Sequence, residues 1–283
     1  MTEIRICDDF DLDKLALSGQ CFRWTGAAGG GYRIVHRDRC LTVRPAGPGR
    51  YRLSCDEAEF CDIWREYFDL DTDYRAIRRA VRAQEDPYLA RACAHGAGIR
   101  ILRQDPWETL VSFIISQNRS IPMIQKSVDL LCTAAGDKLR DADGESFHAF
   151  PSPEQLRALD DERLRACRLG YRCAYVRAAA EAVASGALDL DRLCAAEEPE
   201  TIAALMRVPG VGIKVASCVA LFGLHRLDAF PVDVWMRRIL AREYPEGYPL
   251  ERYRPYNGVY QQYMFYSERI GGGEARDSRA EAG

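Results

Sequence analysis

The stretch Val208-Pro-Gly-Val-Gly-Ile-Lys-Val215 is followed, about twenty residues later, by Phe230-Pro-Val-Asp-Val234. The first segment places a Pro/Gly turn between two apolar helical patterns, with Lys214 opening the second helix. The second segment ends in Asp233, a good N-cap for a helix that begins at the next residue. The two segments therefore predict a tight helical hairpin that brings an amine and a carboxylate to one centre.

The glycines of the turn, Gly210 and Gly212, permit backbone conformations that side chains forbid and allow another backbone to approach. The amides that open the second helix then point outward toward an anion. A DNA phosphate is a suitable anion, and such a contact reads no base sequence. A plain joint between two helices is the alternative interpretation.

Lys214 is unusual in this chain, because only four of its 39 basic residues are lysines. Arginine stays charged and cannot serve as an amine nucleophile. A neutral lysine amine can attack a sugar carbon and form a Schiff base. An ordinary solvated lysine near a helix start is the competing reading.

Asp233 has two compatible roles. As an N-cap it would stabilise its helix by about 1 kcal/mol. As a catalytic group it would stabilise positive charge on a deoxyribose, as carboxylates do in glycoside hydrolysis. Beside the lysine turn, we favour both roles together.

The pattern along the chain predicts an α+β fold. Residues 1–100 form an N-terminal antiparallel sheet domain with flanking helices, since short alternating segments are separated by Gly and Pro clusters such as 29–31. Residues 101–270 form a mainly helical domain, and the small, polar residues 271–283 form a disordered tail. The predicted strands are 21–24, 32–36, 40–44 and 51–54, and the predicted helix starts are Asp105, Ser120, Ser152 and Asp233.

Composition narrows the function classes. The net charge of −3 requires any DNA contact to use a local patch and backbone amides. Eleven scattered cysteines, with no CxxC pair and none after Cys218, disfavour a disulfide framework, zinc and a C-terminal iron–sulfur cluster. The N-terminus lacks a signal-peptide pattern and no apolar run could span a bilayer, so we expect a cytoplasmic protein.

Several motifs together resemble one family. The hairpin with its downstream Pro-Val-Asp is similar to the helix-hairpin-helix, Gly/Pro-Asp superfamily of DNA glycosylases. Segments 18–24, 116–118, 169–172 and 261–265 resemble 8-oxoguanine DNA glycosylases in order and spacing, over nearly the whole chain apart from the tail. Each tetrapeptide alone is a weak signal, whereas five in register are a strong one.

The resemblance implies an enzyme of base-excision repair. Its substrate would be double-stranded DNA containing 8-oxoguanine, whose damaged nucleotide is flipped into a pocket. Lys214 would displace the base through a Schiff base and then cleave the strand by β-elimination, with Asp233 aiding charge development. The resemblance also implies that no cofactor is required, and it is compatible with a monovalent cation bound at the hairpin. We expect a monomer, which would associate with the nucleoid if the source is bacterial.

The recognition residues carry over one at a time. Gly19 matches the carbonyl that accepts the N7 hydrogen of the oxidised base, a test that guanine fails. Cys218 and Phe265 match the pair that sandwiches the base, and Gln261 matches the reader of its pairing edge. Five further residues would contact the rest of the DNA. Asn118 would fill the gap left by the flipped base, Tyr171 would act as a wedge and Arg172 would contact the opposite base, while Gly210 and Gly212 belong to the hairpin.

Three positions depart from the family pattern. Asn118-Arg-Ser120 replaces a run of asparagines known from animal members. Met123 stands where those members place an arginine that reads the opposite cytosine, and methionine cannot donate those hydrogen bonds. We therefore expect weak discrimination of the opposite base, as in bacterial members. Trp235 replaces a histidine expected near a phosphate.

Two other functions remain as alternatives. A glycosylase for another damaged purine would share this fold, but the alkylated-base enzymes of the superfamily lack the lysine. A non-catalytic helix-hairpin-helix DNA-binding module would need neither a base pocket nor Lys214 and Asp233 together.

Overall fold

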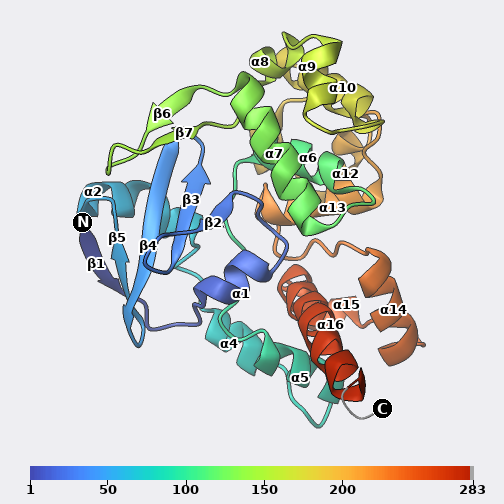
Figure 1. Cartoon of the computed structure of the whole chain (residues 1–283). Coiled ribbons are helices and arrows are strands. Elements are labelled where there is room, and N and C mark those ends of the chain that lie inside the picture. Colours follow the sequence, from blue (N-terminus) through green and yellow to red (C-terminus); the bar gives the residue numbers. More distant parts are fainter. Residues whose placement is uncertain (281–283) are drawn as a thin grey trace.

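The computed structural model describes residues 1–280 and joins a sheet lobe to a helical lobe (Figure 1). The sheet has five antiparallel strands in the order β1-β5-β4-β3-β2. This arrangement confirms the predicted α+β class. The strands are β1 (Thr2–Arg5), β2 (Trp24–Gly26), β3 (Tyr32–His36), β4 (Arg39–Gly47) and β5 (Arg50–Leu53).

The sheet lobe follows the alternation in the sequence, with one correction. Gly29, Gly30 and Gly31 all have positive φ and form the β2–β3 turn, as expected of a tight glycine turn. The predicted strand at 21–24 is wrong over most of its length, because β2 begins only at Trp24. Phe22 instead leaves the sheet and packs edge-on against Phe113 of the helical lobe, with ring centroids 5.6 Å apart.

Short helices cover the sheet and lead into the second lobe. α1 follows β1, and a continuous run of α2, the π-helical segment η1 and α3 buries Phe60, Trp64 and Tyr67 against the sheet. α4 and α5 contribute their apolar residues to the larger helical core. The bounds are α1 (Leu12–Leu17), α2 (Glu57–Glu59), η1 (Phe60–Trp64), α3 (Arg65–Tyr67), α4 (Tyr74–Arg79) and α5 (Pro87–His95).

The helical lobe begins where the sequence signals predict. Asp105 caps α6 through a 2.8 Å hydrogen bond from the Glu108 amide, and Ser152 forms a complete capping box at α8. The hairpin β6–β7 was missed, because its three-residue strands carry too short an alternating pattern. The elements are α6 (Pro106–Ser116), α7 (Ile121–Ala135), β6 (Lys138–Arg140), β7 (Ser146–His148), α8 (Pro153–Arg157), α9 (Asp161–Ala166), α10 (Arg172–Ala184), α11 (Leu190–Ala195), α12 (Glu198–Leu205), α13 (Ile213–Phe222), α14 (Val234–Glu243), α15 (Leu250–Tyr253) and α16 (Asn257–Ala280).

The last helix, α16, joins the two lobes, since it packs against α5 and α14 and lies beside α1 (Figure 1). Its helical bounds extend to Ala280 and so overlap the segment 271–283 that is predicted to be a disordered tail; residues 281–283 lie outside the described part, and the tail stays a prediction.

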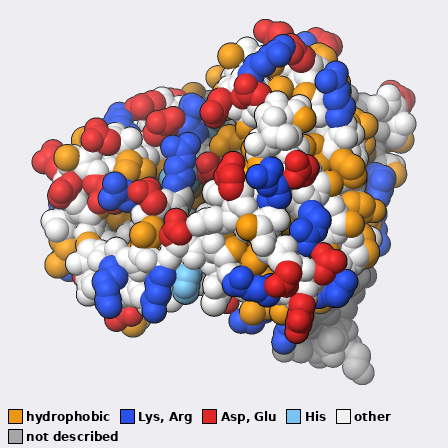
Figure 2. Space-filling view, turned by 90° about the horizontal axis from the view of Figure 1, so that it is seen from above, with side chains coloured by type: hydrophobic (Ala, Val, Ile, Leu, Met, Phe, Trp, Pro, Cys, Tyr) orange, Lys and Arg blue, Asp and Glu red, His pale blue; other side chains and the backbone are white. Residues whose placement is uncertain are grey.

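The surface of the molecule carries charges of both signs. Viewed from above, basic and acidic side chains are interspersed and the surface is hollowed between the lobes (Figure 2). This mixture agrees with the small net charge. Within residues 1–280, no helix has both the length and the apolar character needed to cross a membrane.

Candidate active site

The predicted hairpin connects α12 to α13. Gly210 has φ +82°, and a Cβ there would lie 2.2 Å from the Tyr175 ring of α10, so only glycine fits. The Gly210 carbonyl accepts a 3.1 Å hydrogen bond from Gln117 Nε2 at the end of α6. Gly212 caps α13 without a side chain, so the first amides of that helix remain available to an anion.

Lys214 lies on the first turn of α13 and is half-buried. Its Nζ lies 5.0 Å from the centroid of the Phe113 ring, which itself stacks on Phe222. The Lys214 cation also acts electrostatically on the thiol of Cys218, one turn further along the helix, and opposes the rise of its pKa. The Phe113 ring places the lysine against the packed surface of the lobe.

Asp233 faces the same centre. Its Oδ1 accepts a 2.8 Å hydrogen bond from the Met236 amide and so caps α14, as predicted. That bond occupies one carboxylate oxygen. Burial raises the pKa of the Cys218 thiol, while the Lys214 cation opposes the rise and the Asp233 carboxylate adds to it. The structure therefore brings Lys214, Cys218 and Asp233 within electrostatic reach of one another; we call these three residues the reaction corner.

Gly19 and Phe265 are brought together from opposite ends of the chain. Gly19 has φ +79°, and a Cβ there would lie 3.3 Å from Phe265 Cε1. The Gly19 loop is fixed on both sides, since Gln262 Nε2 donates to the Ser18 carbonyl at 2.6 Å and Leu102 N donates to Gln20 Oε1 at 2.8 Å. Sequence reasoning missed both anchors, because a buried glutamine cannot be told from a solvated one without its partners.

Gln261 precedes Phe265 by one turn of α16 and is buried. Its Oε1 has no hydrogen-bond partner and is sealed from water. A buried acceptor without a donor is unfavourable unless a ligand supplies one. This position suits the predicted reader of a base edge.

The residues predicted to meet the rest of the DNA form a second cluster. Asn118, in the left-handed region at φ +51°, donates from Nδ2 to the Tyr171 hydroxyl at 3.3 Å. Arg172 stacks its guanidinium on the Tyr171 ring, 4.2 Å from the centroid, and donates to the Gln117 carbonyl. Tyr171 is 54% exposed, whereas Arg172 is only 5% exposed. We call Asn118, Tyr171 and Arg172 the wedge corner.

The structure also shows where two of the positions that depart from the family pattern lie. Met123 is 55% exposed near the start of α7. Trp235, on the first turn of α14, lies under the Arg238 guanidinium, 5.5 Å from its ring centroid. Basic charge is therefore close to the position at which the family pattern places a histidine.

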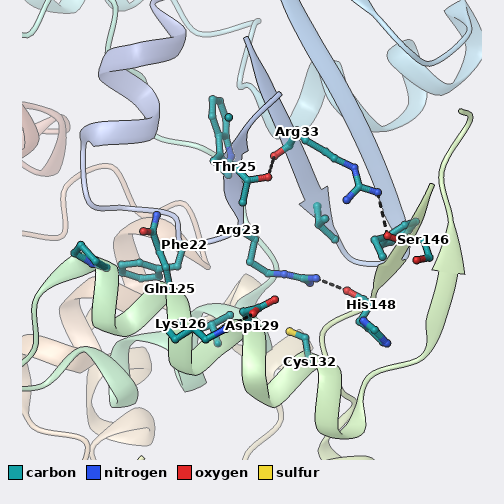
Figure 3. Close-up of a pocket in the computed structure, with 16 residues that line it drawn as sticks. Phe22, Arg23, Thr25, Arg33, Gln125, Lys126, Asp129, Cys132, Ser146 and His148 are labelled. Atoms are coloured by element: carbon teal, nitrogen blue, oxygen red, sulfur yellow. Dashed lines mark hydrogen bonds and ion pairs between the residues drawn. The ribbon is translucent and has the colours of Figure 1, made fainter. Parts of the chain in front are cut away.

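A prominent cavity lies elsewhere, between β2, β3, α7 and the β6–β7 hairpin, with a volume of about 660 Å³ (Figure 3). It is lined by neither Lys214 nor Asp233. Arg23 points across it to the His148 carbonyl and lies 3.5 Å from Glu108. Burial raises the pKa of Glu108 to about 7, against the opposing effect of Arg23. This buried pair was not predicted, since nothing in the sequence links residues so far apart.

Within residues 1–280, no group of three or more His, Cys, Asp or Glu side chains could hold a metal. At the hairpin, the Val208 and Gly210 carbonyls already accept hydrogen bonds from Val211 and Gln117. The monovalent cation there stays a prediction.

Comparisons with known proteins agree with this geometry. Residues 4–110 match the family described as the N-terminal domain of 8-oxoguanine DNA glycosylase, and residues 111–247 match the HhH-GPD superfamily of base excision DNA repair proteins.

Among curated relatives, the N-glycosylase/DNA lyase OGG1 of Arabidopsis thaliana is 40% identical over 77% of this chain and 62% of its own length. The chain thus spans less than two thirds of that relative.

Two solved structures match over almost their full length. MBOgg1 in complex with a low-affinity DNA ligand superposes with a TM-score of 0.89, at 40% identity over 95% of this chain and 96% of that one. The 8-oxoguanine glycosylase/lyase of Clostridium acetobutylicum, in complex with double-stranded DNA containing cytosine opposite 8-oxoguanine, gives 0.86, at 32% identity over 96% and 99%. The chain belongs to the 8-oxoguanine DNA glycosylases of the HhH-GPD superfamily.

Proposed function

We propose that the protein removes 8-oxoguanine from double-stranded DNA and then cleaves the strand at the resulting site. The observation that carries the proposal is the placement of Lys214 within electrostatic reach of Cys218 and Asp233, on the first turn of a helix whose amides suit a phosphate. The matched glycosylases support the substrate class. No organic cofactor is needed for this chemistry, and we propose that a monomer performs it, in the cytoplasm and on the nucleoid if the source is bacterial.

The chemistry proceeds in two stages. The Lys214 amine, once it has lost its proton to solvent, forms a bond to C1′ of the flipped nucleotide as the C1′–N9 bond breaks, and the departing base takes a proton from the new ammonium. The Asp233 carboxylate stabilises positive charge on the sugar during this step. Sugar ring opening gives a Schiff base, loss of a C2′ proton expels the 3′ phosphate by β-elimination, and water then releases the lysine.

The hairpin and the wedge corner supply the binding. The open amides of α13 and Gly212 grip a backbone phosphate, and Tyr171 with Asn118 holds the gap that the flipped nucleotide leaves. Gly19, Gln261, Cys218 and Phe265 enclose the base, and this enclosure separates the proposed enzyme from a module that only holds DNA.

Borohydride trapping on a duplex with one 8-oxoguanine tests the proposal. The wild-type protein should form a covalent adduct, and Lys214→Gln should lose the adduct, base release and strand cleavage by about a thousandfold or more. Lys126→Gln, at an exposed lysine paired with Asp129, is the matched control and should leave all three unchanged.

Other outcomes would overturn the proposal in distinct ways. Base release without an adduct would show a monofunctional enzyme, and substantial cleavage by Lys214→Gln would remove the lysine from the nucleophile role. If neither this nor another damaged base is released, the DNA-binding module is the correct function.

A further inference from the structure

One face of α16 carries Gln261, Phe265 and Arg269, each four residues after the last, so their side chains form a row along the helix. The two ends of the row hold complementary unpaired groups. Gln261 Oε1, an acceptor, and Arg269 Nη1, a donor, are both sealed from water and without a hydrogen-bond partner. The Phe265 ring lies between them in the row. A buried polar atom without a partner indicates a binding group that a ligand completes.

Arg269 lies against Gly19 and Phe265, two of the residues predicted to contact the base. Its Nη2 donates to the Leu17 carbonyl, two residues before Gly19. Its guanidinium carbon lies 5.6 Å from the Phe265 ring centroid, and Nη1 lies 3.2 Å from the point at which a Cβ on Gly19 would stand. The guanidinium is therefore held by the hydrogen bond from Nη2 and by the contact with the Phe265 ring, whereas Nη1 has no hydrogen-bond partner.

No carboxylate among the described side chains forms an ion pair with this guanidinium. Burial lowers the pKa of Arg269, and the neighbouring Tyr266 opposes that change. Desolvating a cation without a counter-charge is costly. If Arg269 only fixed the Leu17 carbonyl in place, its second, unpaired donor would not need to be buried beside Gly19 and Phe265.

The order of groups along the row fits an oxidised guanine. The pairing edge of guanine carries N–H donors, which suit the Gln261 acceptor, and its rings suit the face of Phe265. The carbonyl at C8 is at the opposite end of the purine and is an acceptor, which suits Arg269. On the base, C8 is bonded to N7; on the protein, Arg269 is adjacent to Gly19, the residue expected to meet the N7 hydrogen.

We propose that Arg269 is a specificity-determining residue whose Nη1 donates a hydrogen bond to the C8 oxygen of the flipped base. This inference rests on the proposed function. Ordinary guanine has a hydrogen at C8 and leaves the donor unpaired, so the contact favours the oxidised base.

The test measures binding without turnover, in the Lys214→Gln background. The affinity ratio between duplexes that carry 8-oxoguanine and guanine at the same position is compared with and without Arg269→Met. Methionine preserves an unbranched side chain against Phe265 but has no donor. Loss of a charge-assisted hydrogen bond should reduce the ratio by about tenfold to a hundredfold.

Two further variants sharpen the test. Arg269→Lys keeps a cationic donor, so it should restore part of the ratio, and it also shows whether a folded pocket survives at this position. Arg91→Met removes a guanidinium that lies 6.0 Å from the Tyr88 ring centroid, on a different helix, and should leave the ratio at its starting value.

The opposing outcomes are distinct. An equal loss of affinity for both duplexes in Arg269→Met would assign Arg269 to packing alone and overturn the inference, as would an unchanged ratio. Failure of the proposed function looks different: the Lys214→Gln protein with Arg269 intact would bind both duplexes equally, and the wild-type protein would release no base.

Discussion

The predicted base-binding face of α16 and the wedge corner use polar groups in different ways. On α16, Gln261 Oε1 and Arg269 Nη1 are buried without partners. In the wedge corner, Asn118 bonds Tyr171, and Arg172 stacks on the same ring. In the first group a ligand can supply partners to unpaired atoms, whereas in the second the Asn118 amide and the Tyr171 hydroxyl are already bonded to each other and Arg172 Nε is left unpaired. The comparison teaches that the two groups are prepared to different degrees, since the wedge corner is largely held together by its own contacts.

After Lys214, the largest effect is expected at Asp233. Asparagine caps a helix as well as aspartate does, so Asp233→Asn should keep the unfolding free energy within about 0.5 kcal/mol. It removes the charge that stabilises the sugar cation and should lower kcat for base release by about a hundredfold. Single-turnover kinetics and thermal unfolding on the same preparations would check this.

Asp160→Asn is the matched control, because Asp160 caps α9 through a 2.8 Å hydrogen bond from the Arg163 amide. It should change neither quantity appreciably. A fall in stability at Asp233→Asn that matches the loss of activity would mean that Asp233 is only a cap.

A smaller effect is expected at Met123, beside the wedge corner in the sequence. Met123→Arg adds donors at an exposed position and should raise the preference for cytosine opposite the lesion by about tenfold, because a well-placed bidentate contact discriminates by about 1–3 kcal/mol. The measurement is the ranking of kcat/KM over the four opposite bases.

Met206→Arg controls for added charge, since Met206 is also exposed but caps the end of α12. It should strengthen binding to all four duplexes alike. An unchanged ranking with Met123→Arg would contradict the role assigned to this departure.

The smallest effect is expected at Tyr171. Tyr171→Phe removes the hydroxyl that Asn118 contacts and keeps the ring that Arg172 covers. One neutral hydrogen bond contributes about 0.5–1.5 kcal/mol, so kcat/KM should fall by about twofold to tenfold. Tyr32→Phe, which loses a 2.8 Å hydrogen bond to Asp13 in the sheet lobe, should leave kcat/KM unchanged. Equal losses of kcat/KM in the two variants would show that the hydrogen bond from Asn118 to Tyr171 does not contribute to catalysis.

The sequence predicted what depends on local chemistry. Helix starts at Asp105 and Ser152, the Asp233 cap and the Gly210 turn all follow from residue types within a few positions of one another. The family resemblance added the distant residues of the base pocket, and the structure brings Gly19 to Phe265.

The remaining features depend on long-range packing. Phe22, which precedes β2, packs against Phe113 of the helical lobe, and the neighbouring Arg23 lies 3.5 Å from Glu108. The unpaired state of Arg269 Nη1 could not be foreseen, because an unpaired atom is defined by every neighbour that surrounds it. Periodicity and spacing carry no information of that kind.

The contact of Gly210 with Tyr175 has a mechanical consequence. Tyr175 lies on α10, the same helix that begins with the wedge corner residue Arg172. The loop proposed to bind a phosphate and the proposed wedge, Tyr171, are therefore both fixed to α10. This helix sets the spacing at which the two would meet a duplex, so the proposed site would select DNA whose backbone and opened step match that spacing.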